Sequence, residues 1–277
     1  MYRVTKMAGV LGVSRSGYYA WIEKKSSNHE KEDKELSELI LQIFKKHRGR
    51  YGSPRIWAEL KDKKRYVSRK RVERLMRELK LQARKRRKRI YTTDSKHRLE
   101  ISENILNRQF HAQFPGEKWV SDITYLRTNE GWLYLTTILD LFDRKIIGWS
   151  MSENMTANMV CRALDMSVRN RPPLEGLIFH SDRGVQYCSE EFRALLRNLC
   201  PAVRQSMSRK GNCWDNACAE SFYKTLKDEL DILEGGHSVH QVRTAVFEYI
   251  ETYYNRSRRH SAIGYAIPIE LTTNIAA

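Results

Sequence analysis

The sequence predicts a mixed α/β domain, with a sheet covered by helices, preceded by small all-α modules. Apolar residues recur at helical spacing in the first part of the chain, whereas beyond about residue 110 they form short strand-like runs between turns. Charge divides at a similar point: residues 1–100 carry 30 Lys and Arg against 12 Asp and Glu, a difference of +18, and residues 101–277 carry 20 against 21, a difference of −1. We therefore expect a basic N-terminal region that binds nucleic-acid phosphates, followed by a nearly neutral compact domain.

Length and composition argue against a secreted, a structural-zinc or a membrane protein. The 277-residue length suits one catalytic-sized domain with smaller ones beside it. The five cysteines form no C-x-x-C pair and no histidine pair stands at zinc-ligand spacing near them, which favours a reduced protein without structural zinc. The N-terminus does not resemble a signal peptide and no apolar run approaches membrane-spanning length, so we expect a cytoplasmic protein with no membrane partner.

Residues 1–27 are predicted to form a helix-turn-helix fragment. Gly12 separates two short helical patterns, and Ser14 stands where it can cap the second. Arg15 and Tyr19 would face outward, where they could touch DNA. Because the segment is too short to bury a core alone, half of a larger domain is an equally good interpretation.

Residues 28–83 are predicted to form a second helix-turn-helix module that binds DNA. A first helix carries one apolar stripe, Ser53 and Pro54 begin a second helix, and Ser68 precedes a third. The third helix has one apolar and one basic face, and we expect the basic face to contact phosphates, with a merely solvated face as the alternative. Its basic residues are Arg69, Lys70, Arg71, Arg74 and Arg77.

Residues 84–110 are expected to form a basic linker. Six consecutive cations begin it, and they would repel one another unless they were neutralised, which is typical of a flexible segment that follows DNA. These cations are Arg84, Lys85, Arg86, Arg87, Lys88 and Arg89.

Residues 111–235 are expected to form the compact domain, and residues 236–277 a C-terminal helix and basic tail. In the compact domain we expect an antiparallel meander of three strands, then a helix, a strand and a second helix. Their ranges, in that order, are 118–126, 133–139, 145–150, 157–168, 177–180 and 190–199. Near the C-terminus, a helix over 239–254 would brace this domain and the basic turn 256–260 would contact DNA.

Three acids fall where such a sheet brings chain segments together. Asp122 lies within the first strand, Asp182 follows the fourth, and Glu220 lies on a helix that begins at about residue 216. Phosphoryl transfer on DNA needs an activated water or hydroxyl and a stabilised leaving oxygen, and two Mg²⁺ ions supply both. Magnesium prefers hard carboxylate oxygens, so three acids without His or Cys suit it.

The helix that carries Glu220 also carries other polar residues at matching spacing. Asn216 precedes Glu220 by four residues, and Lys224 and Lys227 follow at i+4 and then i+3. One helix face therefore offers an amide, a carboxylate and two cations, which fits a metal-bound phosphate backbone.

Three motifs carry a resemblance to a known family. Residues 119–125 (WVSDITY), 180–187 (HSDRGVQY) and 206–217 (SMSRKGNCWDNA) resemble the retroviral-integrase-like core of bacterial insertion-sequence transposases. More closely, the stretch from Arg50 to Ser261, which is most of the chain, is similar to OrfB, the second-frame product of the insertion-sequence-3 family.

The resemblance implies an RNase H-like core of the retroviral integrase superfamily. It assigns the catalytic and metal-binding Asp-Asp-Glu (DDE) triad to Asp122, Asp182 and Glu220, with Mg²⁺ or Mn²⁺ as cofactor, and adds Arg209 and Lys210 as DNA contacts. The implied activity is transposition of an insertion sequence by metal-dependent 3′-end cleavage and strand transfer. The implied partners are double-stranded DNA, in the element's terminal inverted repeats and in the target, and further copies of the chain, with the first-frame protein OrfA as a candidate. The implied location is the bacterial nucleoid.

The chain departs from the family pattern in one interval. Between Asp182 and Glu220 lie 37 residues, slightly more than the family's usual spacing, and we interpret the excess as an insertion around residues 198–203. Because that insertion precedes the third motif, it should lengthen a loop without moving Glu220. Glu229 is the weaker alternative for the third acid.

Several other polar or aromatic residues invite functional interpretations that we do not favour. Asp140 and Asp143 flank a turn where polar residues need no function, and His180 is expected to be a partly buried strand residue rather than an orienting group. Trp214 and Tyr223 are expected to pack rather than stack on a base.

Two rival functions remain open at this level. A DNA-binding regulator of transposition with a catalytically silent core would share the charge pattern, although three intact acids argue against it. A metal-dependent RNase H-type nuclease acting on RNA–DNA hybrids would share the acids, although the helix-turn-helix patterns favour duplex DNA. No sustained heptad stripe precedes the core, so the chain is either OrfB acting alone or part of a longer fusion.

Overall fold

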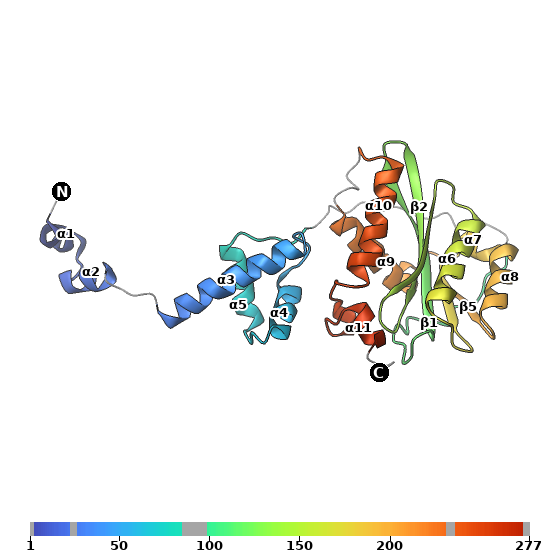
Figure 1. The fold of residues 1–277 in the computed structure, drawn as a ribbon, viewed down its shortest axis with the longest axis horizontal. Coiled ribbons are helices and arrows are strands. Elements are labelled where there is room, and N and C mark those ends of the chain that lie inside the picture. The colour runs from blue at the N-terminus through green and yellow to red at the C-terminus, as the bar shows by residue number, and fades with distance from the viewer. Residues whose placement is uncertain (1–2, 23–26, 85–98, 231–235, 274–277) are drawn as a thin grey trace. The chain divides into compact units, whose positions relative to one another are not determined.

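The protein divides into two compact units, Met1–Ala83 and Arg84–Ala277, each of which is described here by itself (Figure 1). The computed structural model describes residues 3–22, 27–84, 99–230 and 236–273. Within these ranges, no helix combines the length and the apolar character needed to cross a membrane.

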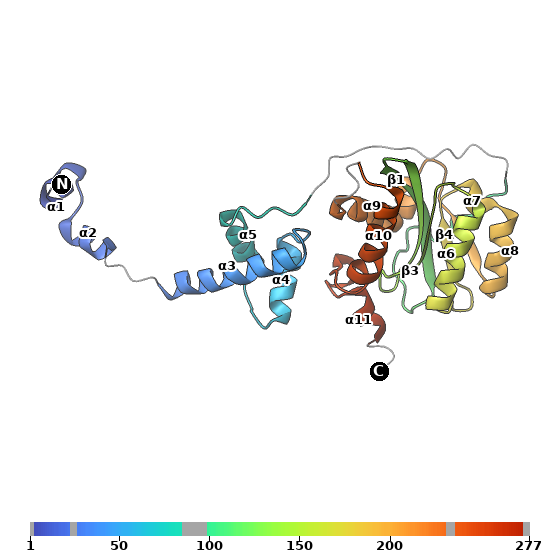
Figure 2. The ribbon, with the colours of Figure 1, turned by 45° about the horizontal axis from the view of Figure 1, so that its top comes forward.

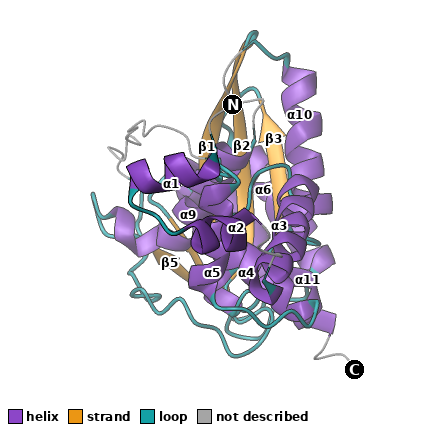
Figure 3. Cartoon of the chain, turned by 90° about the vertical axis from the view of Figure 1, so that its left-hand side faces the viewer, coloured by secondary structure: helices purple, strands orange, loops and turns teal. Residues whose placement is uncertain are grey.

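The first unit contains only helices among its described residues (Figure 3). Helix α1 ends where Gly12 adopts the left-handed conformation (φ 65°), which costs a glycine little, and α2 follows after a short turn. Ser27 and Glu30 form a capping box at the start of α3, and the Ser68 hydroxyl caps α5. The helices are α1 (Val4–Leu11), α2 (Arg15–Ile22), α3 (Asn28–Lys46), α4 (Ser53–Asp62) and α5 (Arg69–Glu78).

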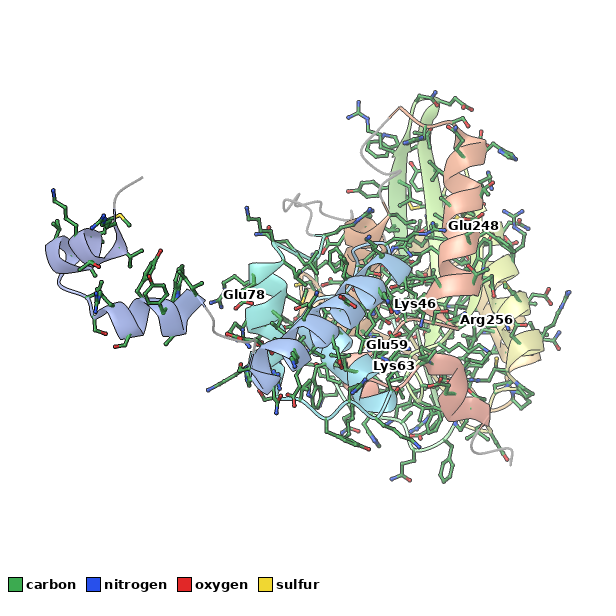
Figure 4. All side chains as sticks on the ribbon, turned by 60° about the vertical axis from the view of Figure 1, so that its left-hand side comes forward. Lys46, Glu59, Lys63, Glu78, Glu248 and Arg256 are labelled. Atoms are coloured by element: carbon green, nitrogen blue, oxygen red, sulfur yellow. The ribbon has the colours of Figure 1, made fainter. Side chains whose placement is uncertain are left out.

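Helices α3, α4 and α5 share a small apolar core. Ile40 of α3, Leu60 of α4 and Val72 of α5 are completely buried, as the helical stripe predicted. An ion pair lies beside this core: the Glu59 carboxylate accepts hydrogen bonds from Lys46 Nζ at 2.8 Å and from His47 Nε2 at 2.7 Å. Lys46 and Glu59 come from different helices and lie close together (Figure 4).

The second unit is built on a five-stranded mixed sheet in the order β3-β2-β1-β4-β5. Strands β1, β2 and β3 form the predicted antiparallel meander, and β4 and β5 add to it in parallel on the other side of β1. The central strand is therefore β1, which carries Asp122. The strands are β1 (Lys118–Thr128), β2 (Gly131–Asp140), β3 (Ile146–Ser152), β4 (Ile178–Ser181) and β5 (Arg204–Met207).

Helices cover both faces of this sheet (Figure 2). One apolar cluster joins the face that includes Trp119 and Phe179 to α6 (Ala157–Asn170), α7 (Val185–Cys188) and α8 (Glu190–Leu199). The other joins the face that includes Val120 and Ile178 to α9 (Ala217–Glu229) and α10 (Val239–Glu248). Because side chains alternate along a strand, even-numbered residues of β1 point toward α9.

Shorter elements complete the second unit. The 3₁₀-helix η1 (Cys213–Asn216) leads into α9, and α10 continues as a π-helical segment, η3 (Tyr249–Tyr254), so that the predicted helix over 239–254 is present in two forms. A 3₁₀-helix, η4 (Ser261–Ile263), and α11 (Pro268–Thr273) follow.

Some backbone groups of both outer strands are bound by other parts of the chain. At the β3 edge, the buried Asn255 side chain accepts from Ile146 N and donates to Ile146 O, both at 2.9 Å. At the β5 edge, Met207 N donates to Glu103 O. These contacts occupy backbone groups that would otherwise be open to pairing with another strand.

Candidate active site

The sheet register brings Asp122 and Asp182 to neighbouring positions. Strands β1 and β4 run in parallel, with Val120 opposite His180, and the next residues bring Asp122 and Asp182 close enough for their charges to interact. Asp182 immediately follows β4, where its carboxylate accepts a hydrogen bond from Gly184 N at 2.9 Å and fixes the turn into α7. A strand interior and a strand end thus supply the first two acids.

Helix α9 brings Glu220 to the same face of the sheet. Three side chains from η1 and α9 reach β1: Asn216 Nδ2 donates to Ser121 O at 2.9 Å, Tyr223 Oη donates to Asp122 O at 2.5 Å, and Lys227 Nζ donates to Thr124 Oγ1 at 2.6 Å. Glu220 precedes Tyr223 on α9 by three residues, so it lies on the same side of the helix, and its charge acts on Asp122.

The other two acids and burial perturb the ionisation of Asp122. Burial raises the pKa of Asp122 well above its usual range, the Asp182 carboxylate raises it further and Glu220 adds to this, whereas the Ile123 N–H and the Lys227 ammonium act in the opposite direction. Desolvation also raises the pKa of Glu220. A cation near Asp122 would therefore stabilise its ionised form.

The donor set fits a hard divalent cation. The site offers carboxylate oxygens together with the Asn216 amide oxygen, which is buried and accepts no hydrogen bond within the described part of the chain. No three His, Cys, Asp or Glu side chains among the described residues already stand at ligand distance from one point.

The remaining predicted DNA contacts of the second unit occupy different environments. Lys224 is exposed on α9, whereas Lys227 is partly buried and lies 5.2 Å from the centroid of the Tyr125 ring. Asn216 is buried against β1. Lys210 is exposed, and half-exposed Arg209 is paired with Asp215.

In the first unit, the predicted basic face of α5 is largely paired within the unit. Arg71 Nε and Arg74 Nη2 bind the Asp33 carboxylate of α3 at 2.7 and 2.6 Å, and Arg69 pairs with Glu73. Lys70 and Arg77 are exposed. Arg84 ends the described part of this region, and Lys85, Arg86, Arg87, Lys88 and Arg89 lie outside the described residues.

The alternative third acid, Glu229, has a structural partner instead. Its carboxylate is buried, forms three hydrogen bonds with the Arg258 guanidinium at 2.7 to 3.1 Å and accepts another from Tyr249. The pair joins α9 to the chain after η3. Part of the basic turn that was expected to contact DNA thus braces the core.

Three further polar side chains have the structural role that was expected of them, but they are more deeply buried than expected. Asp140 and Asp143 flank the β2–β3 turn as expected, but both are completely buried in an ion-pair cluster with Arg171. His180 is completely rather than partly buried, and its two ring nitrogens contact the hydroxyls of Ser206 and Ser208.

The segment after α8 also differs in part from what was expected. Tyr223 packs as expected, but the expectation that Trp214 packs is wrong, since its side chain is 69% exposed. Strand β5 is only four residues long and three of them are polar, so its pattern is too weak to be recognised from the sequence.

Sequence reasoning missed two polar groups that support the site. Tyr187 is completely buried, and its hydroxyl lies 2.8 Å from Ser121 Oγ and 3.2 Å from Thr136 Oγ1. Burial and the nearby Asp122 and Asp182 carboxylates hold the pKa of this phenol well above its usual range, so it stays neutral. The signal available was its place in the same short motif as Asp182.

The second missed group is Asp215, which is completely buried. Hydrogen bonds from Arg209 lower the pKa of its carboxyl, against the effect of burial, and Arg108 adds to the lowering. Its position between Trp214 and Asn216 in the third motif was the only sequence signal.

Family models match both units. A model described as an HTH-like domain matches residues 30–89, and two models described as integrase core domains match residues 112–213 and 202–268. The two core models together span all three candidate acids.

Named relatives match over nearly the whole chain. Transposase InsF for insertion sequence IS3A of Escherichia coli (strain K12) is 41% identical over 271 residues, which covers 96% of this chain and 93% of that protein. An uncharacterized 31 kDa protein of insertion element IS600 from Shigella sonnei is also 41% identical, over 95% of this chain and 96% of that protein.

Solved structures give more distant matches. The HTLV-2 integrase catalytic core domain, solved in complex with magnesium, is 16% identical and has a TM-score of 0.43 over 57% of this chain and 96% of that one. The catalytic core domain of BIV integrase is 15% identical, with a TM-score of 0.40 over 58% and 96%.

Proposed function

Since the chain belongs to the IS3 family of insertion-sequence transposases and carries an integrase core, we propose that it cuts the 3′ ends of its element and joins them to DNA, with Asp122, Asp182 and Glu220 as its catalytic acids. The observation that carries this proposal is the convergence of three carboxyl groups from β1, the end of β4 and α9 on one face of the sheet.

The proximity of Asp182 and Glu220 to Asp122 supports a role of the three acids in metal binding. Burial and the charges of Asp182 and Glu220 destabilise the ionised form of Asp122, and a divalent cation would offset that cost. When bound, two magnesium or manganese ions would help to activate the attacking hydroxyl and stabilise the leaving oxygen. Asp122 and Asp182 would hold such ions from the sheet, and Glu220 from the helix.

The surroundings of the acids support a fixed geometry. The Tyr223 hydroxyl holds the backbone of Asp122 against α9, and the Gly184 N–H orients the Asp182 carboxylate. Lys227, at the far end of the same helix face, places a cation where it can meet the DNA backbone. These groups would position substrate and acids before the chemical step.

The first unit would supply DNA binding. Its HTH-like match and its charge support contact with the terminal inverted repeats, and we infer that copies of the chain assemble on two such ends, with OrfA as a candidate partner. The domain boundaries after residues 27, 83, 110 and 235 are part of the same proposal.

A cleavage assay tests the catalytic assignment. Purified protein is incubated with a labelled duplex that carries the element's end, in Mg²⁺ or EDTA, and cleaved and strand-joined products are measured. We expect both products to require metal and to fall by roughly a thousandfold or more in Asp182→Asn and Glu220→Gln. Asp165→Asn, a change at a half-exposed acid on α6, is the matched control and should cut normally.

The outcomes separate the rival functions. Wild-type protein that binds the end but never cuts, even with OrfA added, would favour a silent regulator, and cleavage confined to RNA–DNA hybrids would favour a nuclease. Calorimetric titration with Mn²⁺ measures the number of ions without relying on activity. One ion at saturation would contradict the two-ion proposal.

A further inference from the structure

The loop over residues 208–216, which we call the bridging loop, links the two aspartates of the site. At its start, Ser208 N donates to Ser181 O at 3.0 Å, directly before Asp182. At its end, Asn216 Nδ2 donates to Ser121 O at 2.9 Å, directly before Asp122. Every residue of the bridging loop therefore lies within a few residues of a contact beside a candidate catalytic acid.

The interior of the bridging loop is held by Asp215. Arg209 donates to its carboxylate from the backbone N–H and twice from the guanidinium, at 2.8 to 3.0 Å. Arg108, from outside the loop, donates to the same carboxylate at 2.9 Å and to the Asn212 side chain at 3.1 Å. Charge-assisted bonds of this number fix the conformation of the loop.

Trp214 projects outward from this fixed loop. Its side chain is 69% exposed although its neighbour Asp215 is completely buried, and no other large apolar side chain of the bridging loop is exposed. Trp214 is two residues from Asn216, so their Cα atoms lie within about 8 Å of each other. The exposed indole therefore lies close in the chain to Asn216, which contacts the residue before Asp122, on a loop held by hydrogen bonds.

The bridging loop also carries cationic side chains, and Arg108 contacts it from outside. The Arg108 and Arg209 side chains are 45% and 50% exposed, and Lys210 is exposed on the same loop. A protein partner would be expected to meet a wider apolar patch, whereas an aromatic face among cations matches a nucleobase joined to phosphates. The chemistry of this surface therefore favours nucleic acid.

We propose that Trp214 stacks on an unpaired base at the DNA end and so positions the adjacent phosphodiester over the acids. This proposal rests on the proposed function. It adds Trp214 as a positioning residue and a DNA end with an unpaired base as the form of DNA that Trp214 recognises. The base pair that is broken would be the terminal one, where unpairing costs least free energy. Stacking on the indole would offset that cost.

Base stacking can be measured without catalysis. A duplex with an unpaired 2-aminopurine at its end is titrated with full-length protein in Ca²⁺ or EDTA, because this base is bright when unstacked and is quenched by an aromatic ring. We expect wild type and Trp214→Phe to quench it, and Trp214→Ala to bind the duplex without quenching. Trp132→Ala, a change at another exposed tryptophan of the same unit, is the matched control and should quench like wild type.

Cleavage of two matched duplexes tests the positioning role. On a fully paired end, Trp214→Ala should cut roughly tenfold more slowly than wild type, and on an end with mismatched terminal pairs the difference should shrink to less than about threefold, because the base is already free. Trp214→Phe should restore most of the rate on paired ends.

The two proposals fail in different ways. Quenching by a wild-type protein that never cuts would contradict the catalytic proposal and leave stacking in place. Normal cutting and normal quenching by Trp214→Ala would overturn the stacking proposal alone. An equal loss on paired and mismatched ends, together with a smaller assembly in size-exclusion chromatography, would also overturn it and assign Trp214 to an interface between proteins.

Discussion

The position of the Asp182 carboxylate depends on Gly184, two residues later in the chain. A Cβ atom added to Gly184 would lie 3.0 Å from Asp182 Oδ1 and 3.1 Å from Gln186 Oε1, closer than ordinary contacts. Both neighbours are side-chain oxygens, so they can move, but moving the carboxylate displaces a candidate metal ligand. The turn therefore couples a backbone requirement to the chemistry of the site.

We predict that Gly184→Ala lowers cleavage by tenfold or more, a loss of about 1.4 kcal/mol of transition-state stabilisation, with little change in thermal stability. Cleavage rates and melting temperatures measure the two effects separately. Val185→Ala, at a side chain that is 44% exposed in the same turn, is the control. Unchanged cleavage by Gly184→Ala would show that the position of Asp182 tolerates this shift.

The ionisation of Glu59 makes the folding stability of the first unit depend on pH. Burial alone would raise the pKa of this carboxyl, but hydrogen bonds and charges from His47 and Lys46 lower it to about 2, from an ordinary value of 4.5. Because the pKa is lower in the folded state, the stabilisation is complete above pH 4.5 and is lost as the pH falls toward 2. The full effect is on the order of 3 kcal/mol.

Hydrogen exchange of the α3 and α4 amides in the full chain, followed from pH 6 downward, measures this prediction. Protection corrected for intrinsic exchange should fall below pH 4.5 in wild type. Glu59→Gln should have lower protection at pH 6 and a flatter acid profile. Parallel profiles for the two proteins would assign the acid sensitivity to other groups.

At the scale of elements, one backbone contact sets the distance between β3 and α6. A Cβ atom on Gly148 would lie 2.2 Å from the carbonyl oxygen of Ala163 and 2.8 Å from Ser167 Cβ. A carbonyl within a helix cannot turn away as a side chain can. The packing of helix on strand therefore requires a glycine here.

We predict that Gly148→Ala lowers the free energy of unfolding of the second unit by about 3 kcal/mol or more, because the helix must move away from the sheet. Urea unfolding monitored by circular dichroism measures the change. Gly184→Ala, which meets only side-chain oxygens, is the contrasting variant and should unfold nearly as wild type does. Equal stabilities for all three proteins would mean that α6 shifts at little cost.

The elements also show what the sequence can and cannot predict. The meander, α6, β4 and α8 were predicted because each has a clear apolar period, and the family and the RNase H-like core were predicted from three short motifs. The exposure of Trp214 and the burial of Asp140 were not, since each depends on partners distant in sequence, such as Arg108 and Arg171. Local patterns encode period and motif but not these long-range ion pairs.

At the scale of the whole molecule, charge is distributed unevenly, with the excess of Lys and Arg confined to the first 100 residues. Within the described part of α5, several of these cations already pair with acids of the same unit. The six consecutive cations that begin at Arg84 therefore become the main candidates for the salt-dependent part of DNA binding.

We predict that replacing Lys85, Arg86, Arg87, Lys88 and Arg89 with Gln flattens the plot of log binding constant against log salt concentration. The slope should fall by about 0.9 for each replaced residue that contacts a phosphate. Fluorescence anisotropy across a salt series measures the slope. The double variant Arg169→Gln, Arg197→Gln, at two exposed cations of the second unit, should keep the wild-type slope. An unchanged slope in the first variant would place the phosphate contacts elsewhere.

The contact of Asn255 with the β3 edge has a consequence for synthesis. Its partner, Ile146, lies 109 residues earlier, so during translation the backbone of Ile146 lacks this partner until the ribosome has released most of the chain. Contacts of such separation slow folding and leave a strand able to pair with a neighbouring nascent chain. A chain that stops at residue 238, before α10, should accumulate as insoluble aggregate rather than as a competitor for DNA, and fractionation of expressing cells would show which occurs.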